Sequence, residues 1–221
     1  MIRYKNMSLA TQVMEVIEES ILSEKYKRGD IISESRLSEE LGVSRTPIRE
    51  ALGRLMEDGL VEDSPNGTMV VGVSDEDVTD YYGIKKVMEG EAAARAANHI
   101  TDEQIKELRD LIDQQEFYEG KNDHIKVRDL DTQLHGIIYE ASGSRVMQQI
   151  LSGIHRHLIR YRYRSLAMDD GDRMHQSILE HKEIVDAIAA HDPERARTAM
   201  SRHQQNAKEN MQRLRAKQNE E

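Results

Sequence analysis

The chain of 221 residues contains no cysteine, no tryptophan, only one phenylalanine and only three prolines. Without cysteine it can form neither a disulfide nor a thiolate site, which is consistent with a reducing compartment. No apolar run approaches the length of about 18 residues that a membrane span needs. The amino terminus also lacks a charged and then apolar leader. We therefore expect a cytoplasmic protein with no membrane segment.

The length suits two domains of about 70 and 150 residues better than one, and the wealth of Ala, Glu, Gln, Arg and Met favours helix. The net charge is −10, and residues 1–73 contain nine Lys and Arg against thirteen Asp and Glu. This balance argues against nonspecific coating of nucleic acid. It leaves room for sequence-specific binding through a local basic patch, for which the candidates are Lys25, Lys27, Arg28, Arg36, Arg45 and Arg49.

Residues 29–63 contain the pattern of a helix-turn-helix. Leu37 and Leu41 form an apolar pair on a short helix, and Gly42 can adopt the positive φ of a tight turn after it. Ser44 is a candidate N-cap for a second helix, in which apolar residues recur at helical spacing. Arg45 and Arg49 fall together on the opposite, solvent-facing side. A helix of this kind can enter the major groove of DNA.

A change of hydrophobic period follows this helix. Apolar residues at 60–61 and 69–71 flank the turn formers Ser64-Pro65-Asn66-Gly67, which predicts a two-stranded wing with Gly67 at its tip. Ser74 to Asp77 resembles a capping box, so we place the domain boundary after residue 73. The predicted domains are 1–73, a winged helix-turn-helix preceded by a helix over 8–25, and 74–221, an all-helical bundle. The helices of the bundle are expected near 75–98, 102–119, 123–141, 145–166, 173–190 and 193–214. The fold class is therefore mainly α.

The segments Gly29 to Glu34 and Leu41 to Leu52 resemble the winged helix-turn-helix of GntR-family bacterial transcription regulators. The resemblance implies a DNA-reading head joined to a ligand-sensing domain. It also implies that recognition-helix and wing residues contact a double-stranded operator. Here these are Arg36, Ser44, Arg45, Thr46, Arg49 and Gly67. Arg36 could alternatively pair with Glu39 or Glu40.

All nine histidines lie beyond residue 73. Asp131 and His135 stand four apart and so share one helix face. His181 and His203 lie at similar numbers of residues before and after the turn at Asp192-Pro193. Antiparallel packing of the two helices would therefore place the two side chains side by side. Three imidazoles and a carboxylate could hold a borderline divalent ion such as Zn²⁺ or Ni²⁺. Histidines in helical cores are, however, often hydrogen-bonded fillers.

The second domain resembles the all-helical, metal-binding FCD domain of the FadR-type GntR branch. The resemblance is carried by Glu89, by Asp131-Thr132-Gln133-Leu134-His135, by Glu180-His181 and by His203. It implies a metal at Asp131, His135, His181 and His203 that coordinates a small organic acid. Lys85 lies where family members commonly have arginine, so it is a candidate effector contact. Unlike arginine, it cannot make a bidentate hydrogen bond with a carboxylate.

Arg173 could be a second basic contact or a surface residue that caps the fifth helix of the bundle. His155, His157, Arg160, Arg162 and Arg164 could line the same cavity, although a solvated helix face is the simpler interpretation.

The sequence thus predicts a homodimeric transcription regulator, of the repressor type, that binds a pseudo-palindromic operator and responds to a small carboxylate at a metal site. It predicts no enzymatic activity. Two alternatives stay open: a metal-dependent hydrolytic enzyme fused to a DNA-binding head, and an architectural DNA-binding dimer without an effector.

Overall fold

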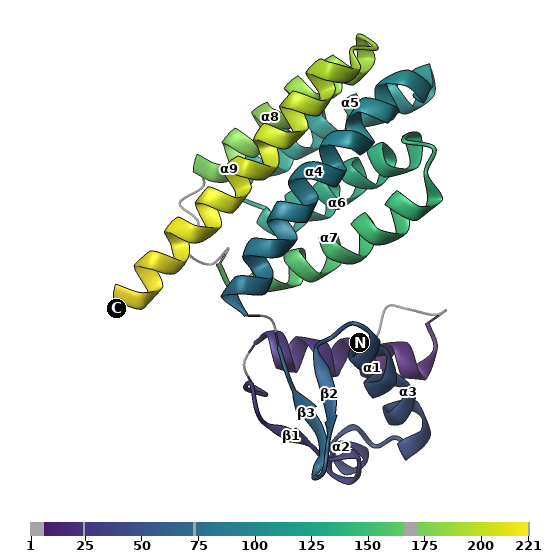
Figure 1. Cartoon of the computed structure of the whole chain (residues 1–221), viewed down its shortest axis with the longest axis vertical. Coiled ribbons are helices and arrows are strands. Elements are labelled where there is room, and N and C mark those ends of the chain that lie inside the picture. Colours follow the sequence, from purple (N-terminus) through teal and green to yellow (C-terminus); the bar gives the residue numbers. More distant parts are fainter. Residues whose placement is uncertain (1–6, 24, 73, 166–171, 221) are drawn as a thin grey trace. The chain divides into compact units, whose positions relative to one another are not determined.

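The structure is a computed structural model that describes residues 7–23, 25–72, 74–165 and 172–220. The chain divides into two compact units, Met1–Asp75 and Glu76–Glu221 (Figure 1). Among the described residues, none of the helices combines the length and the apolarity that crossing a bilayer requires.

The first unit contains three helices and a small sheet. Its helices are α1 (Leu9–Leu22), α2 (Glu34–Leu41) and α3 (Arg45–Glu57), and its strands are β1 (Ile31–Ile32), β2 (Val61–Ser64) and β3 (Gly67–Val70). One apolar cluster joins α1, α2, α3 and the sheet, and it includes Ile17, Leu37, Ile48, Leu55 and Val70. This is the predicted winged helix-turn-helix.

The wing has one strand more than the sequence predicted. The sheet is antiparallel with the order β1-β3-β2, in which Ile31 pairs with Met69 and Val61 pairs with Val70. The predicted hairpin is therefore confirmed as β2 and β3, and β1 adds a third strand that the sequence analysis did not predict. A strand of two residues is too short to show a period of alternation, so the sequence pattern could not reveal β1.

The turn between α2 and α3 forms as expected at Gly42, which ends α2 in the left-handed conformation with φ 65°. The Ser38 hydroxyl donates to the Val43 carbonyl at 2.6 Å and fixes the turn. Ser44 occupies the N-cap position of α3, but its side chain makes no capping hydrogen bond. The cap was thus placed correctly by the sequence, while the expected bond is absent.

The second unit consists of helices within its described residues. They are α4 (Asp75–His99), α5 (Asp102–Glu119), α6 (His124–Ala141), α7 (Arg145–Ser165), α8 (Asp172–Ala189) and α9 (Pro193–Glu220). Thr101 and Gln104 form the capping box that opens α5. The predicted end of the last helix at residue 214 was wrong, since α9 runs to Glu220.

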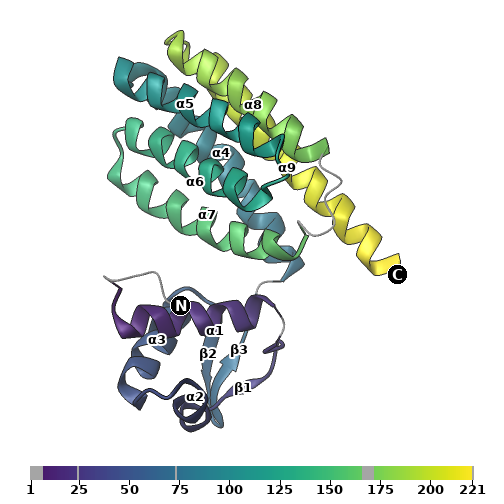
Figure 2. The ribbon, with the colours of Figure 1, turned by 180° about the vertical axis from the view of Figure 1, so that it is seen from behind.

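Helix α4 packs against several neighbours, while Ile84 and Val87 on it are exposed. It lies beside α9 in Figure 1, and α5 and α6 cover it when the unit is seen from behind in Figure 2. Gly90 marks how closely α4 and α9 approach, because a Cβ added there would lie 2.5 Å from Ser201 Oγ. The core is a continuous cluster from five helices, with Leu108, Leu134, Ile138, Ile184 and Met200 among its buried members. Polar side chains enter this core from several helices.

Candidate metal centre and nucleic-acid interface

Helix α3 presents two different faces. Ile48, Ala51, Leu52 and Leu55 are buried against the rest of the unit. Arg45 and Arg49, by contrast, are exposed on the other side. The helix is therefore packed by its apolar face, and its cationic face remains accessible.

The three predicted contact arginines differ in their partners. Arg36 pairs with Glu40 at 2.9 Å, which is one of the two alternatives that the sequence allowed. Arg49 pairs with Glu34 across the turn, with its Nε 2.8 Å from the nearer carboxylate oxygen. Both arginine side chains stay largely exposed, at 74% and 65%. For Arg45 the structure gives no ion pair within the described residues.

The tip of the wing is a two-residue turn between Ser64 and Gly67. Gly67 has φ +127°, a conformation that favours glycine, and an added Cβ would lie 3.2 Å from the Ile31 side chain. The Ser64 hydroxyl donates to the Gly67 carbonyl at 2.8 Å. The backbone conformation of the wing thus explains why glycine occupies this position. Gly67 is also exposed, as a contact with a DNA groove would require.

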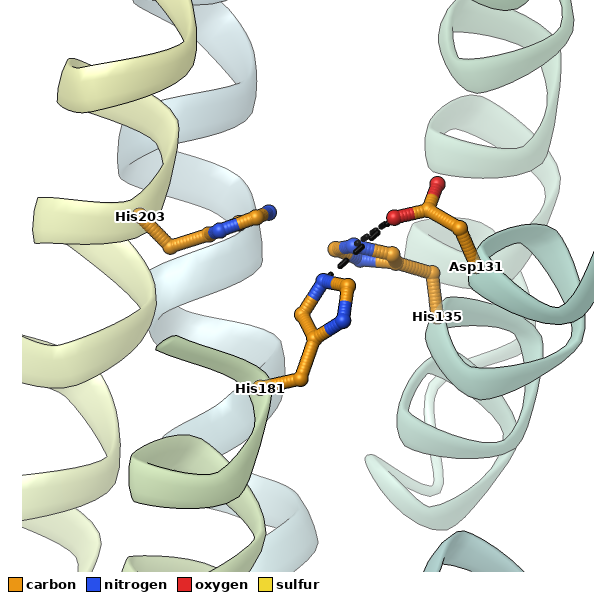
Figure 3. A group of neighbouring side chains, drawn as sticks. All are labelled: Asp131, His135, His181 and His203. Carbon is orange, nitrogen blue, oxygen red and sulfur yellow. Dashed lines mark ion pairs between the residues drawn. The ribbon is translucent and has the colours of Figure 1, made fainter. Parts of the chain in front are cut away.

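In the second unit, helices α6, α8 and α9 bring four predicted side chains together (Figure 3). Asp131, His135, His181 and His203 can each offer one ligand atom so that all these atoms lie within 4.8 Å of one another. His181 Nε2 lies 3.3 Å from Asp131 Oδ1, and His135 Nε2 lies 3.8 Å from the same oxygen. The rings of His181 and His203 are 4.8 Å apart, as antiparallel packing of α8 and α9 predicted.

Two of the imidazoles are oriented by hydrogen bonds on their outer nitrogen. Nδ1 of His181 lies 3.0 Å from the Gln115 amide oxygen, and Nδ1 of His203 lies 2.7 Å from Glu180 Oε2. Because an amide or carboxylate oxygen only accepts, each Nδ1 must donate. Each Nε2 is then an unprotonated acceptor, and Figure 3 shows one ring nitrogen of His203 directed toward the other three residues. Such outer bonds are the usual support of metal-binding histidines.

Burial sets the ionisation of the cluster. It lowers the pKa of His203 to about 3, against the opposing effect of Glu180. It also lowers the pKa of His135. Burial alone would raise the pKa of Asp131, but the neighbouring imidazoles of His181 and His135 hold it well below its usual range. The cluster thus combines the neutral imidazoles of His135 and His203 with an ionised carboxylate, the forms that bind metal.

The residues fit a metal ion on a second ground. His181 Nε2 is buried and has no hydrogen-bond partner among the described residues. A buried acceptor without a partner costs free energy, and a cation held between His181 and Asp131 would remove that cost. Three imidazoles and one carboxylate are suitable ligands for Zn²⁺ or Ni²⁺.

A second polar network adjoins the cluster through His135. Glu89 on α4 is fully buried, lies 3.6 Å from His135 Nδ1 and pairs with Lys85 at 3.2 Å. It also accepts hydrogen bonds from Tyr139 and Gln204. Burial opposes ionisation of this carboxyl, but Lys85 and His135 outweigh it and lower its pKa.

The two expected effector contacts are both buried and already paired. Lys85 Nζ lies 3.1 Å from His155 Nδ1 in addition to its pair with Glu89. Arg173 makes two bonds of 2.8 Å to Glu180, the residue that holds His203. The alternative of Arg173 as a surface residue was wrong, since it is only 8% exposed. Its geometry supports a role in positioning His203 rather than an effector contact.

The cavity candidates on α7 have mixed outcomes. His155 is buried, with Nε2 3.7 Å from Asp131 Oδ2, so the solvated-face interpretation was wrong for this residue. The side chains of His157, Arg160, Arg162 and Arg164 lie outside the described residues.

Sequence reasoning assigned no role to the supporting residues Gln115, Tyr139 and Gln204. Tyr139 lies four residues after His135 on α6, and Gln204 follows His203 on α9, so helical spacing could have suggested both. Gln115 lies on α5, where no local spacing connects it to the histidines.

Comparison with known proteins agrees with this geometry. Residues 9–71 match the family described as bacterial regulatory proteins, gntR family, and residues 80–206 match the FCD domain. The chain belongs to this gntR family, in its FCD-containing form. It is therefore a DNA-binding transcription regulator rather than an enzyme, with an FCD ligand-binding domain as its second unit.

Individual relatives of this gntR regulator are distant but cover most of it. The HTH-type transcriptional repressor RspR of Escherichia coli (strain K12) is 25% identical over 205 residues, which are 92% of this chain and 89% of that protein. The uncharacterized HTH-type transcriptional regulator YdhC of Bacillus subtilis (strain 168) is 26% identical over 198 residues, 87% and 86% of the two chains. The solved structure of E. coli McbR/YncC shares the fold with a TM-score of 0.73 at 22% identity, covering 96% of this chain and 99% of that one.

Proposed function

We propose that this regulator binds a divalent metal ion through Asp131, His135, His181 and His203, and that a small carboxylate bound at the ion controls its affinity for an operator. The observation that carries the proposal is the convergence of the four ligand atoms within 4.8 Å in a buried site. The bonds from Gln115 and Glu180, which leave Nε2 of His181 and His203 free to coordinate, support it.

The ligand set favours Zn²⁺ or Ni²⁺, because imidazole nitrogen suits both ions and hard cations prefer oxygen. When bound, the ion would supply a Lewis-acidic position for a carboxylate oxygen. The protein's own residues hold the imidazoles of His135 and His203 neutral and keep Asp131 ionised.

For the first unit we propose that Arg45 and Arg49 contact bases or phosphates in the major groove, with Arg36, Ser44 and Thr46 beside them and Gly67 at the minor groove. Support comes from the exposure of these residues and from the packing of α3 by its opposite face. Two such heads in a homodimer would bind a pseudo-palindromic operator, since twofold symmetry in the protein is matched by the half-sites.

We further propose that the regulator acts as a repressor in the cytoplasm. The name of RspR as a transcriptional repressor supports this direction of control. A carboxylate can release the operator only if it binds the DNA-free form more tightly than the DNA-bound form.

The test combines metal analysis with DNA binding. Elemental analysis of the purified protein should find up to one divalent ion per chain, and dialysis against EDTA should remove it. An operator obtained by in vitro selection should then be titrated by fluorescence anisotropy with and without small carboxylates. Carboxylates should change operator affinity in the metal-loaded protein only. An equal response after EDTA would contradict the metal-dependent effector site.

A further inference from the structure

A small cavity lies directly beside the metal cluster. Asp131, His135 and His203 form one wall, Leu158 and Ala207 contribute apolar surface, and polar side chains of α4, α7 and α9 complete it. Its volume of about 10 Å³ is roughly the space of one water molecule. In this conformation the cavity holds one water-sized group, which favours a small effector.

The cation that faces this cavity is already neutralised. Lys85 is 5% exposed and pairs with Glu89, which is fully buried. Tyr139 and Gln204 donate to the same carboxylate, so Glu89 is held in place by three side chains. An effector cannot use the charge of Lys85 without separating a buried ion pair, which is costly.

The charges around the cavity can be balanced among the side chains that the structure describes. The two carboxylates of Asp131 and Glu89 and the single ammonium of Lys85 leave one negative charge. The Arg173–Glu180 pair contributes no net charge. With a divalent ion bound, these described side chains therefore leave one positive charge in excess, which a monoanion would neutralise. A dianion would leave an unbalanced negative charge in a buried site, which is unfavourable.

A hydrogen-bonding group without a partner also faces this cavity. Tyr82 lines it and is 2% exposed, and its hydroxyl is buried with no hydrogen-bond partner among the described residues. A buried hydroxyl of this kind is normally satisfied by a ligand or water. It can donate to an anion that reaches the metal cluster from the side of α4.

We propose that the Lys85–Glu89 pair makes the effector pocket selective for small monoanions, above all monocarboxylates, and that the Tyr82 hydroxyl donates a hydrogen bond to them. This inference rests on the proposed metal site. It adds the charge of the ligand and three residues that determine specificity, Tyr82, Lys85 and Glu89.

Propionate and malonate provide the test, because they have equal numbers of carbon atoms and differ by one carboxylate. Each is titrated calorimetrically into metal-loaded and EDTA-treated full-length protein at neutral pH and matched ionic strength. Propionate should bind the loaded protein at least about tenfold more tightly than malonate, as expected from the cost of one unbalanced buried charge. Neither should bind the EDTA-treated protein, whose site is net negative.

Two variants make the test sharper. Glu89→Gln is nearly isosteric and leaves Lys85 unneutralised, so the preference should shift toward malonate by about tenfold or more. Tyr82→Phe should weaken propionate by about tenfold or more while metal content stays unchanged. Glu107→Gln on the exposed face of α5 is the matched control and should change neither affinity.

The outcomes separate this inference from the metal proposal. Protein that takes up no metal refutes the metal site itself. Loaded protein that binds malonate as tightly as propionate, that binds no propionate, or that keeps its preference in Glu89→Gln refutes the selectivity for monoanions.

Discussion

The guanidinium of Arg49 lies against the carboxylate of Glu34, with its Nε 3.0 Å from one oxygen and 2.8 Å from the other. Glu34 opens α2 and Arg49 belongs to α3, so the bond crosses the turn of the helix-turn-helix. The bond engages Nε of the guanidinium. An arginine held in this manner loses less freedom on binding than a mobile one.

Replacing Glu34 by Gln should lower discrimination between operator and unrelated DNA. The substitution releases Arg49 and removes a negative charge near the phosphates, so nonspecific affinity should rise relative to specific affinity. Anisotropy titrations with a selected operator and a scrambled duplex, at one fixed salt concentration, measure the ratio. An unchanged ratio would mean that Glu34 does not orient Arg49 for recognition.

Arg45 provides a more direct test of the DNA-reading face. Arg45→Ala should weaken operator binding by about 1–3 kcal/mol, the usual contribution of a specific arginine contact. Lys106→Ala on the exposed surface of α5 is the control for loss of a positive charge. Operator affinity that is identical in the two variants would remove Arg45 from the interface.

The metal site can be tested through its ligands and their supports. His135→Ala and His181→Ala should lower metal content sharply, and Glu180→Gln should lower metal affinity by about 10–100-fold by loosening His203. His175→Ala is a suitable control, because His175 is 55% exposed and pairs with Glu119 away from the cluster. Elemental analysis and competition with a chromogenic chelator give the readouts. Full stoichiometry in both alanine variants would disprove the site.

The metal-free protein should lose stability in mild acid. The pKa of His203 is lowered to about 3 in the folded chain, whereas the unfolded value is about 6.5. Between these values the unfolded chain binds the extra proton, so the free energy of unfolding should fall as pH falls from about 6.5 toward 3. The lowered pKa of Asp131 adds to the loss at the acid end.

Urea denaturation of EDTA-treated protein at pH 7.5 and pH 5 measures this dependence. His203→Gln should reduce the difference between the two pH values, because it removes one buried titrating ring. Equal stability at both pH values in the wild-type chain would show that the buried histidines do not resist protonation.

Two glycines of the first unit should respond to alanine in opposite directions. Gly42 has φ +65°, so Gly42→Ala should destabilise the unit by about 1–2 kcal/mol. Gly53 lies within α3, where a Cβ would meet nothing within 4 Å, so Gly53→Ala should stabilise it by up to about 1 kcal/mol. Chemical denaturation of both variants checks the signs. Similar effects in both would show that backbone conformation does not control stability at the turn.

The features that the sequence predicted best depend on local chemistry. Helix starts followed from caps such as Thr101, and the Asp131–His135 pair followed from the helical repeat. The prediction that His181 and His203 lie side by side required only that α8 and α9 run antiparallel. Local spacing could not reveal the pair of Glu89 with Tyr139, nor that of Glu180 with Asn206, because packing between helices creates these contacts.

The short strand β1 has a mechanical consequence for the DNA-reading unit. Because Ile31 and Ile32 bond to β3 and lead directly into α2, the turn at Pro65-Asn66 is tied to the helix-turn-helix on both sides of the sheet. The wing tip and α3 should therefore move as one rigid piece. In the proposed homodimer, a small molecule that controls DNA binding would then change the distance between the two first units, while the spacing of the wing tip and α3 within each unit stays the same.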